Sequence, residues 1–156
     1  MVFANRIADR MTGTFTCDLP DETFELGRRL GNTFRVGDAL LLHGGLGAGK
    51  TLFTKGILDA LGFDVDEVTS PSFTLVNIYP TAAFDVHHID LWRIDERTDA
   101  AFGVGLDEIV ESETAVVIIE WAERLGRYNF RGRVIDVMIE GEGDDPRSIE
   151  IKGSAL

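Results

Sequence analysis

Runs of apolar residues along the chain predict the strands of a sheet. Residues 39–43 and 115–119 are almost continuously apolar, which is typical of parallel strands that are covered on both faces. A shorter β-prone segment lies at 14–16. Four further β-rich runs form two predicted hairpins, 73–79 with 84–90 and 133–140 with 147–152. The sequence therefore predicts a sheet with parallel strands at its centre and antiparallel pairs beside them.

Apolar residues at helical spacing predict helices between these strands. Pro20 opens a segment in which Leu26, Leu30 and Phe34 are four residues apart, the spacing of one helix face. A second helix is expected after the glycine-rich run at 44–49, and Gly62 closes it. Residues 95–113 are helical in composition but polar, and glycines interrupt them. The alternation of strands and helices predicts one α/β domain.

Composition agrees with a single folded domain. The chain has 156 residues, of which 44% are apolar and 27% charged, so a sizeable core is expected and wholesale disorder is excluded. Cys17 is the only cysteine, which rules out an internal disulfide and fits a reducing cytosol. The sequence shows neither a signal-peptide pattern nor an apolar run long enough for a membrane span. A cytoplasmic protein that does not enter a membrane is expected.

The net charge is strongly negative, and the acidic residues are unevenly distributed along the chain. The formal net charge is −12, and residues 64–113 carry 12 acidic against 2 basic side chains. Such a surface repels phosphate backbones, so stable binding of tRNA by this chain alone is not expected. The acidic stretch is interpreted either as a docking face for basic groups of a partner or as a solvated surface.

The most specific motif is GGLGAGKT at residues 44–51, which matches G-x-x-x-x-G-K-[ST] between a predicted strand and a predicted helix. Glycines let backbone amides turn inward onto phosphate oxygens, and the helix N-terminus adds its positive dipole. Lys50 would reach the β- and γ-phosphates, and the Thr51 hydroxyl would ligate Mg²⁺. A nucleoside triphosphate site in a P-loop NTPase-like three-layer sandwich is predicted. Adenine is favoured because no N-K-x-D run follows.

A second carboxylate for Mg²⁺ is expected at the carboxyl edge of the sheet. Glu120 directly follows the apolar run at 115–119, although a solvated strand-end acid is the alternative. His88, Asp90 and Trp92 should share one face of an extended strand. Asp90 is predicted to lie near Mg²⁺ or the γ-phosphate, whereas a zinc site is disfavoured because histidines and cysteines are too few.

Residues 70–74 and Trp121 each allow two interpretations. Residues 70–74, with three hydroxyls beside Pro71, form either a loop that senses the γ-phosphate or a plain Ser-Pro turn. Trp121 is expected in the core, with packing near the nucleotide as the alternative.

Together the motifs resemble the TsaE (YjeE) family of bacterial ATPases, which are needed to make threonylcarbamoyladenosine in tRNA. The resemblance runs from about Leu19 to Ile151, and residues 1–12 and 153–156 lie outside it and are expected to be flexible. It rests on the following segments in order: LPDE at 19–22, the motif at 44–51, SPSFTLV at 70–76, HIDLWR at 88–93, GLDE at 105–108 and Glu120-Trp121. The chain departs from the family at Gly45, Ser72 and Trp92, where Asp, Thr and Tyr are common.

The resemblance implies a weak Mg²⁺-dependent ATPase that acts with a two-protein tRNA threonylcarbamoyl transferase complex of the TsaB and TsaD type. Hydrolysis would reset that complex. The implied catalytic residues are Lys50, Asp90 and Glu120, with Mg²⁺ on Thr51 and Glu120. The implied nucleotide contacts are Leu46, Gly47, Ala48, Gly49, Lys50, Thr51, Ser72 and Trp121, with Glu22, Pro146 and Arg147 by the nucleoside.

Two other function classes fit the nucleotide motif. A small-molecule phosphotransferase would transfer phosphate to a metabolite, but residues 64–113 offer only Arg93 and Arg97 for an arginine-rich lid. A non-catalytic adaptor would bind ATP without releasing phosphate.

Overall fold

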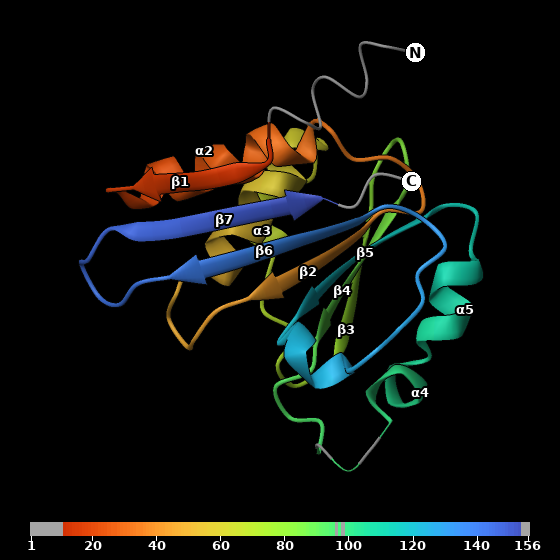
Figure 1. Cartoon of the computed structure of the whole chain (residues 1–156). Helices are drawn as coiled ribbons and strands as arrows, with labels where there is room; N and C mark the ends of the chain where they lie inside the picture. Colours follow the sequence, from red (N-terminus) through yellow and green to blue (C-terminus); the bar gives the residue numbers. More distant parts are fainter. Residues whose placement is uncertain (1–10, 96, 98, 154–156) are drawn as a thin grey trace.

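A seven-stranded sheet organises the molecule, and the computed structural model describes residues 11–95, 97 and 99–153. The strands are β1 (Gly13–Cys17), β2 (Ala39–His43), β3 (Val76–Pro80), β4 (Asp85–Asp90), β5 (Ala115–Glu120), β6 (Val134–Glu140) and β7 (Arg147–Gly153). They lie in the order β1-β7-β6-β2-β5-β4-β3 (Figure 1). Strands β6, β2, β5 and β4 are parallel, whereas β1, β7 and β3 pair antiparallel with their neighbours. The predicted mostly parallel centre with antiparallel hairpins is confirmed.

Helices cover both faces of this sheet. They are α2 (Pro20–Gly31), α3 (Lys50–Ala60), α4 (Ala100–Val104) and α5 (Leu106–Glu111), with short 3₁₀ turns η1 (Val65–Glu67) and η2 (Ala122–Leu125). Figure 1 shows α2 and α3 on one side of the sheet and α4 and α5 on the other. Strand β5 is buried along its whole length. Val116 and Ile118 join the core cluster on the α2 and α3 side, and Val117 and Ile119 join the other, so the three-layer sandwich is confirmed.

Helices α2 and α3 pack closely because glycines line their contact. A Cβ atom on Gly27 would lie 2.3 Å from the carbonyl oxygen of Phe53, and one on Gly56 would lie 2.1 Å from that of Phe24. Side chains larger than hydrogen therefore cannot fit without moving the backbone. The contact fixes α3, whose N-terminus bears the nucleotide motif, against the rest of the domain.

Three predicted boundaries are wrong for local reasons. Helix α2 ends at Gly31, and Phe34 is buried in the following turn, where its N–H donates to the Gly31 carbonyl. Strand β3 begins at Val76 instead of Phe73, because the Leu75 N–H closes a turn onto the Pro71 carbonyl and Leu75 has a φ of 67°. The helical stretch predicted at 95–113 is two short helices, since Gly105 adopts a left-handed conformation between them.

The two ends of the chain lie largely outside the described residues, which begin at Met11 and end at Gly153. Met11 is buried in the core, and Gly153 is the last residue of β7. Among the described residues, no helix combines the length and apolar character needed to cross a bilayer.

Candidate active site

The glycine-rich motif forms a loop between β2 and α3, the strand–loop–helix arrangement that the sequence predicts. Gly47 and Gly49 have φ values of 76° and 108°, conformations that favour glycine. Gly44 passes close to β6, where a Cβ would lie 2.7 Å from the Ile139 carbonyl oxygen. Helix α3 starts at Lys50, so its free N–H groups and positive dipole end face the loop.

Lys50 is held within the loop itself. Its Nζ donates to the carbonyl oxygens of Gly44 and Gly45 at 2.7 and 2.9 Å and lies 4.3 Å from the centroid of the Trp121 ring. The side chain is buried. Burial lowers the pKa of Lys50, and the carboxylates of Glu120 and Asp90 oppose that shift. The ammonium shares one cavity with the two acidic residues that the sequence predicts for the site.

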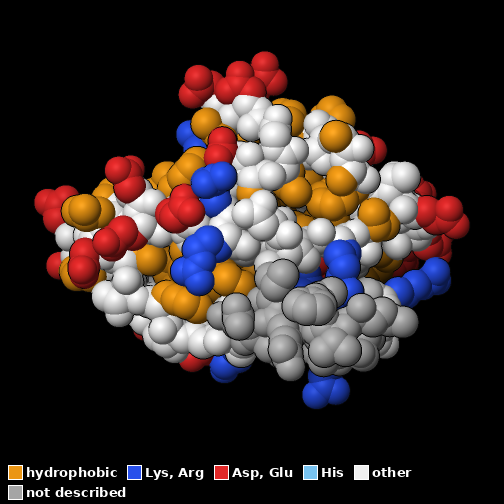
Figure 2. Space-filling model, turned by 90° about the horizontal axis from the view of Figure 1, so that it is seen from above, with side chains coloured by type: hydrophobic (Ala, Val, Ile, Leu, Met, Phe, Trp, Pro, Cys, Tyr) orange, Lys and Arg blue, Asp and Glu red, His pale blue; other side chains and the backbone are white. Residues whose placement is uncertain are grey.

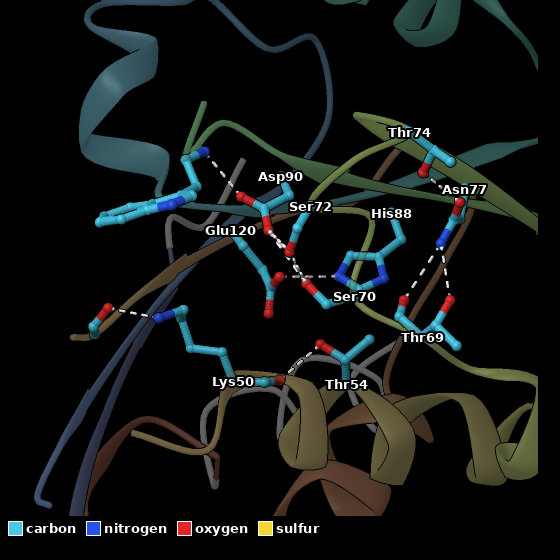
Figure 3. A network of polar contacts seen from close by, with 12 residues as sticks. Lys50, Thr54, Thr69, Ser70, Ser72, Thr74, Asn77, His88, Asp90 and Glu120 are labelled. Carbon is cyan, nitrogen blue, oxygen red and sulfur yellow. Dashed lines mark hydrogen bonds and ion pairs between the residues drawn. The ribbon is translucent and has the colours of Figure 1, made fainter. Parts of the chain in front are cut away.

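Asp90 and Glu120 reach the site from neighbouring strands. Asp90 ends β4 and Glu120 ends β5, and the two residues are paired in the parallel ladder. Both are buried, at 3% and 2% exposure. Their side chains lie on the side of the sheet that faces α3 (Figure 3). Glu120 is thus buried at a strand end, and the alternative of a solvated strand-end acid is wrong.

The hydrogen bonds of Asp90 tie the 70–74 segment to the sheet. Its Oδ1 accepts from the Trp92 N–H at 2.8 Å. Its Oδ2 accepts from the hydroxyls of Ser70 and Ser72 at 3.2 and 3.3 Å (Figure 3). Ser70, which the sequence analysis did not place among the contact residues, therefore belongs to the site.

Glu120 is bonded differently. Its Oε1 is buried and accepts no hydrogen bond from the residues that the structure describes, and its Oε2 lies 3.5 Å from Nε2 of His88. A buried carboxylate oxygen without a donor is costly unless a cation serves it. No group of three or more His, Cys, Asp or Glu side chains suited to a metal occurs among the described residues. Mg²⁺ fits this sparse set, because it is commonly held by one or two protein oxygens together with phosphates and water.

Most predicted site residues line one cavity of about 410 Å³. From the predicted set these are Leu46, Gly47, Gly49, Lys50, Thr51, Ser72, Asp90, Glu120 and Trp121. Strand β4 ends at Asp90, so Trp92 lies just beyond it and does not continue the predicted strand face. The Trp92 and Trp121 rings nevertheless meet, with centroids 4.3 Å apart. Trp121 packs against the core, as expected, and also lines the cavity; its packing near a nucleotide stays a prediction.

A second cavity of about 240 Å³ lies on the other side of the loop. Ala48, Gly49 and Arg147 line it, together with Cys17. Arg147 joins the β6–β7 turn to the loop, since its Nε donates to the Ala48 carbonyl oxygen at 2.9 Å.

Two residues predicted to lie by the nucleoside do not line either cavity. The Glu22 carboxylate accepts from the N–H groups of Asp18 and Leu19 and so caps α2. Pro146 stands in the β6–β7 turn, immediately before Arg147.

The sequence does not predict two contacts between arginines and aromatic rings near the larger cavity. Arg93, which lines this cavity, stacks over Phe73 with Cζ 4.3 Å from the ring centroid, and Arg124 lies 5.3 Å from the centroid of Trp92, another lining residue. These pairs join segments that are distant in the sequence. Only the aromatic residue next to a basic one at 92–93 hints at them.

Comparisons with known proteins identify the family of this chain. The family model for threonylcarbamoyl adenosine biosynthesis protein TsaE matches residues 17–149. The tRNA threonylcarbamoyladenosine biosynthesis protein TsaE of Bacillus subtilis is 34% identical over 130 residues, which are 83% of this chain and 78% of that protein. The protein of the same description from Mycobacterium bovis is 37% identical over 140 residues, or 83% and 81% of the two chains.

A solved structure is also similar. The crystal structure of Bacillus subtilis YdiB superposes with a TM-score of 0.69 at 29% sequence identity, covering 92% of this chain and 86% of that one. With the family model spanning most of the domain, the chain belongs to the TsaE family of threonylcarbamoyl adenosine biosynthesis proteins.

Proposed function

We propose that this protein is an Mg²⁺-dependent ATPase that serves threonylcarbamoyladenosine modification of tRNA in the cytoplasm. The observation that carries the proposal is the convergence of Lys50, Thr51, Asp90 and Glu120 on one cavity beside the glycine-rich loop. A cation, a hydroxyl and two carboxylates at the start of a helix are the groups that phosphoryl transfer from a nucleotide needs.

The loop and α3 would bind the phosphates. The backbone amides at the start of α3 and the Lys50 ammonium would face the phosphate oxygens. The smaller cavity would take the nucleoside, because Ala48 and Gly49 form one wall of it and Arg147 another. Glu22 would act there indirectly, by fixing the start of α2 next to Asp18 and Leu19.

Thr51 and Glu120 would hold Mg²⁺, which supplies positive charge to the phosphate oxygens during hydrolysis. Asp90 has a different task, because both of its oxygens already accept hydrogen bonds. It would hold Ser70 and Ser72 at the cavity wall. Loss of the γ-phosphate could then alter the order of that loop, as in other nucleotide switches.

The proposed partners are the two proteins of the tRNA threonylcarbamoyl transferase complex, of the TsaB and TsaD type, which ATP hydrolysis would reset. Family membership supports this assignment. Phe73 and Leu46 line the larger cavity and are 84% and 81% exposed. A partner seated on them would contact the site directly, which gives it a physical route to change the rate of hydrolysis.

Phosphate release from ATP tests the assignment of the site. The wild-type protein should bind ATP with Mg²⁺ and release phosphate slowly to water. Lys50→Ala should abolish binding, whereas Lys55→Ala, one turn further along α3 and outside both cavities, should not. Phosphate appearing on a metabolite would favour a phosphotransferase. Binding without any release, even with the partners present, would favour an adaptor.

A further inference from the structure

His88 is a fully buried histidine that has no role in the hydrolysis proposed above. Its exposure is 0%, and neither ring nitrogen makes a hydrogen bond within the described structure. Its Nε2 lies 3.5 Å from Oε2 of Glu120, somewhat longer than a typical N–H···O bond of about 2.9 Å. Figure 3 shows the imidazole beside this carboxylate.

The sheet register produces this contact. His88 on β4 is paired with Ile118 on β5, and Asp90 is paired with Glu120. His88 and Glu120 are therefore diagonal neighbours on one face of two parallel strands, a separation that long side chains bridge. The Tyr79 ring also lies near the imidazole, with centroids 6.0 Å apart and the two planes tilted by 42°. The imidazole thus has both a core aromatic ring and the carboxylate as neighbours.

We propose that His88 is a positioning residue for Glu120. In this role, an Nε2–H would donate to Oε2 across the 3.5 Å contact, which would leave Oε1 as the carboxylate oxygen that serves the cation. This inference rests on the proposed function, because it assigns Mg²⁺ to Glu120. Carboxylates that ligate metals are commonly oriented by such outer hydrogen bonds, and loss of one weakens metal affinity about 10- to 100-fold.

The two amide residues separate positioning from simple core filling. Glutamine places a side-chain N–H at about the position of Nε2, whereas asparagine reaches only to the position of Nδ1. His88→Gln should therefore keep the contact with Glu120, and His88→Asn should lose it. His87→Asn is the matched control, because adjacent residues of a strand point to opposite faces of the sheet.

The measurement is binding of a fluorescent ATP analogue to the full chain, first in EDTA and then along a Mg²⁺ titration. Binding in EDTA should be the same in all variants. The Mg²⁺ concentration at the midpoint should rise on the order of tenfold in His88→Asn and stay unchanged in His88→Gln and His87→Asn. In a Glu120→Gln background, His88→Asn should have no further effect.

The results distinguish failure of the positioning role of His88 from failure of the proposed function. A wild-type midpoint in a folded His88→Asn variant, or an equal rise in His88→Gln, would overturn the positioning role. Wild-type protein that binds no nucleotide, or binds it independently of Mg²⁺, would overturn the proposed function and this inference with it. If His88→Asn melts below the assay temperature, His88→Met fills a similar volume without a donor and takes its place.

Discussion

Asp90 and Glu120 are paired residues of adjacent parallel strands, yet their carboxylates are bonded differently. Both Asp90 oxygens accept hydrogen bonds, from Ser70, Ser72 and the Trp92 backbone, whereas Oε1 of Glu120 is buried and has no donor among the described residues. The two residues are paired between β4 and β5, but their different hydrogen bonding suits them to different roles. Asp90 holds the 70–74 segment, whereas Glu120 keeps an oxygen free for the cation that we propose.

The first prediction concerns this difference. Glu120→Gln should reduce Mg²⁺-dependent hydrolysis on the order of 100-fold, because the negative charge at the cation site is lost. Binding of ATP in EDTA should be spared. Phosphate release and nucleotide titration check both parts, with Glu113→Gln, an exposed acid outside the cavity, as the control. Normal hydrolysis by Glu120→Gln would show that the metal assignment is wrong.

Cys17 provides a second prediction and a pH test. Burial raises the pKa of its thiol, so the reactive thiolate is scarce at neutral pH and its fraction rises about tenfold per pH unit below that pKa. Iodoacetamide should react slowly at pH 7 and faster toward alkaline pH. ATP should slow the reaction further, because Cys17 lines the smaller cavity.

Mass spectrometry of the adduct suffices, since the chain has one cysteine. Protein unfolded in urea should react at the rate of an ordinary thiol and serves as the control. Fast alkylation of the folded protein at neutral pH would contradict the raised pKa of the thiol. The absence of any protection by ATP would contradict the place proposed for the nucleoside.

The third prediction concerns the contact between α2 and α3. Gly27→Ala should destabilise the protein by about 1–3 kcal/mol, because the added methyl group meets the Phe53 backbone at 2.3 Å. Gly103→Ala, in α4, meets only the Ile94 side chain at 3.9 Å. It should be neutral or stabilising by up to about 1 kcal/mol through helix propensity. Urea unfolding measures the free energy of unfolding of both variants. An unchanged free energy of unfolding in Gly27→Ala would contradict the tight contact between α2 and α3.

The fourth prediction is that the isolated protein does not bind tRNA appreciably. In the stretch 64–113, Asp90 is the one described acid that is buried, and most of the others are exposed. Figure 2 shows acidic side chains gathered toward the edges of one face, with Lys and Arg scattered between them. No appreciable tRNA binding is expected at physiological salt in a filter-binding assay. Tight, salt-sensitive binding would contradict the prediction.

The sequence predicts best what local pattern determines. The apolar run of β5 and the glycines before α3 require a buried strand and a tight loop wherever they occur, so the centre of the site follows from them. The start of β3 was mistaken because Leu75 adopts a left-handed conformation that its side chain does not signal. Pairing of β1 with β7 joins residues near the two ends of the chain, and no local pattern encodes it.

The same limit applies within the site. Lys50, Thr51 and Glu120 could be assigned from the motif and from the strand end that it requires. The contact of His88 with Glu120 depends on the relative register of β4 and β5, which a single sequence does not determine. The Glu22 carboxylate shows the converse case: the resemblance places it by the nucleoside, whereas in the structure it accepts hydrogen bonds from the backbone at the start of α2, so its role at the nucleoside stays a prediction.

The fifth prediction is that the two partner proteins control the rate of ATP hydrolysis at this site. Steady-state phosphate release should be measured for the protein alone, for the two transferase proteins alone, and for all three together with ATP and Mg²⁺. We expect slow phosphate release by the protein alone and a rate several-fold higher in the complete mixture, with Lys50→Ala abolishing the increase. Equal rates with and without the two partners would contradict this prediction.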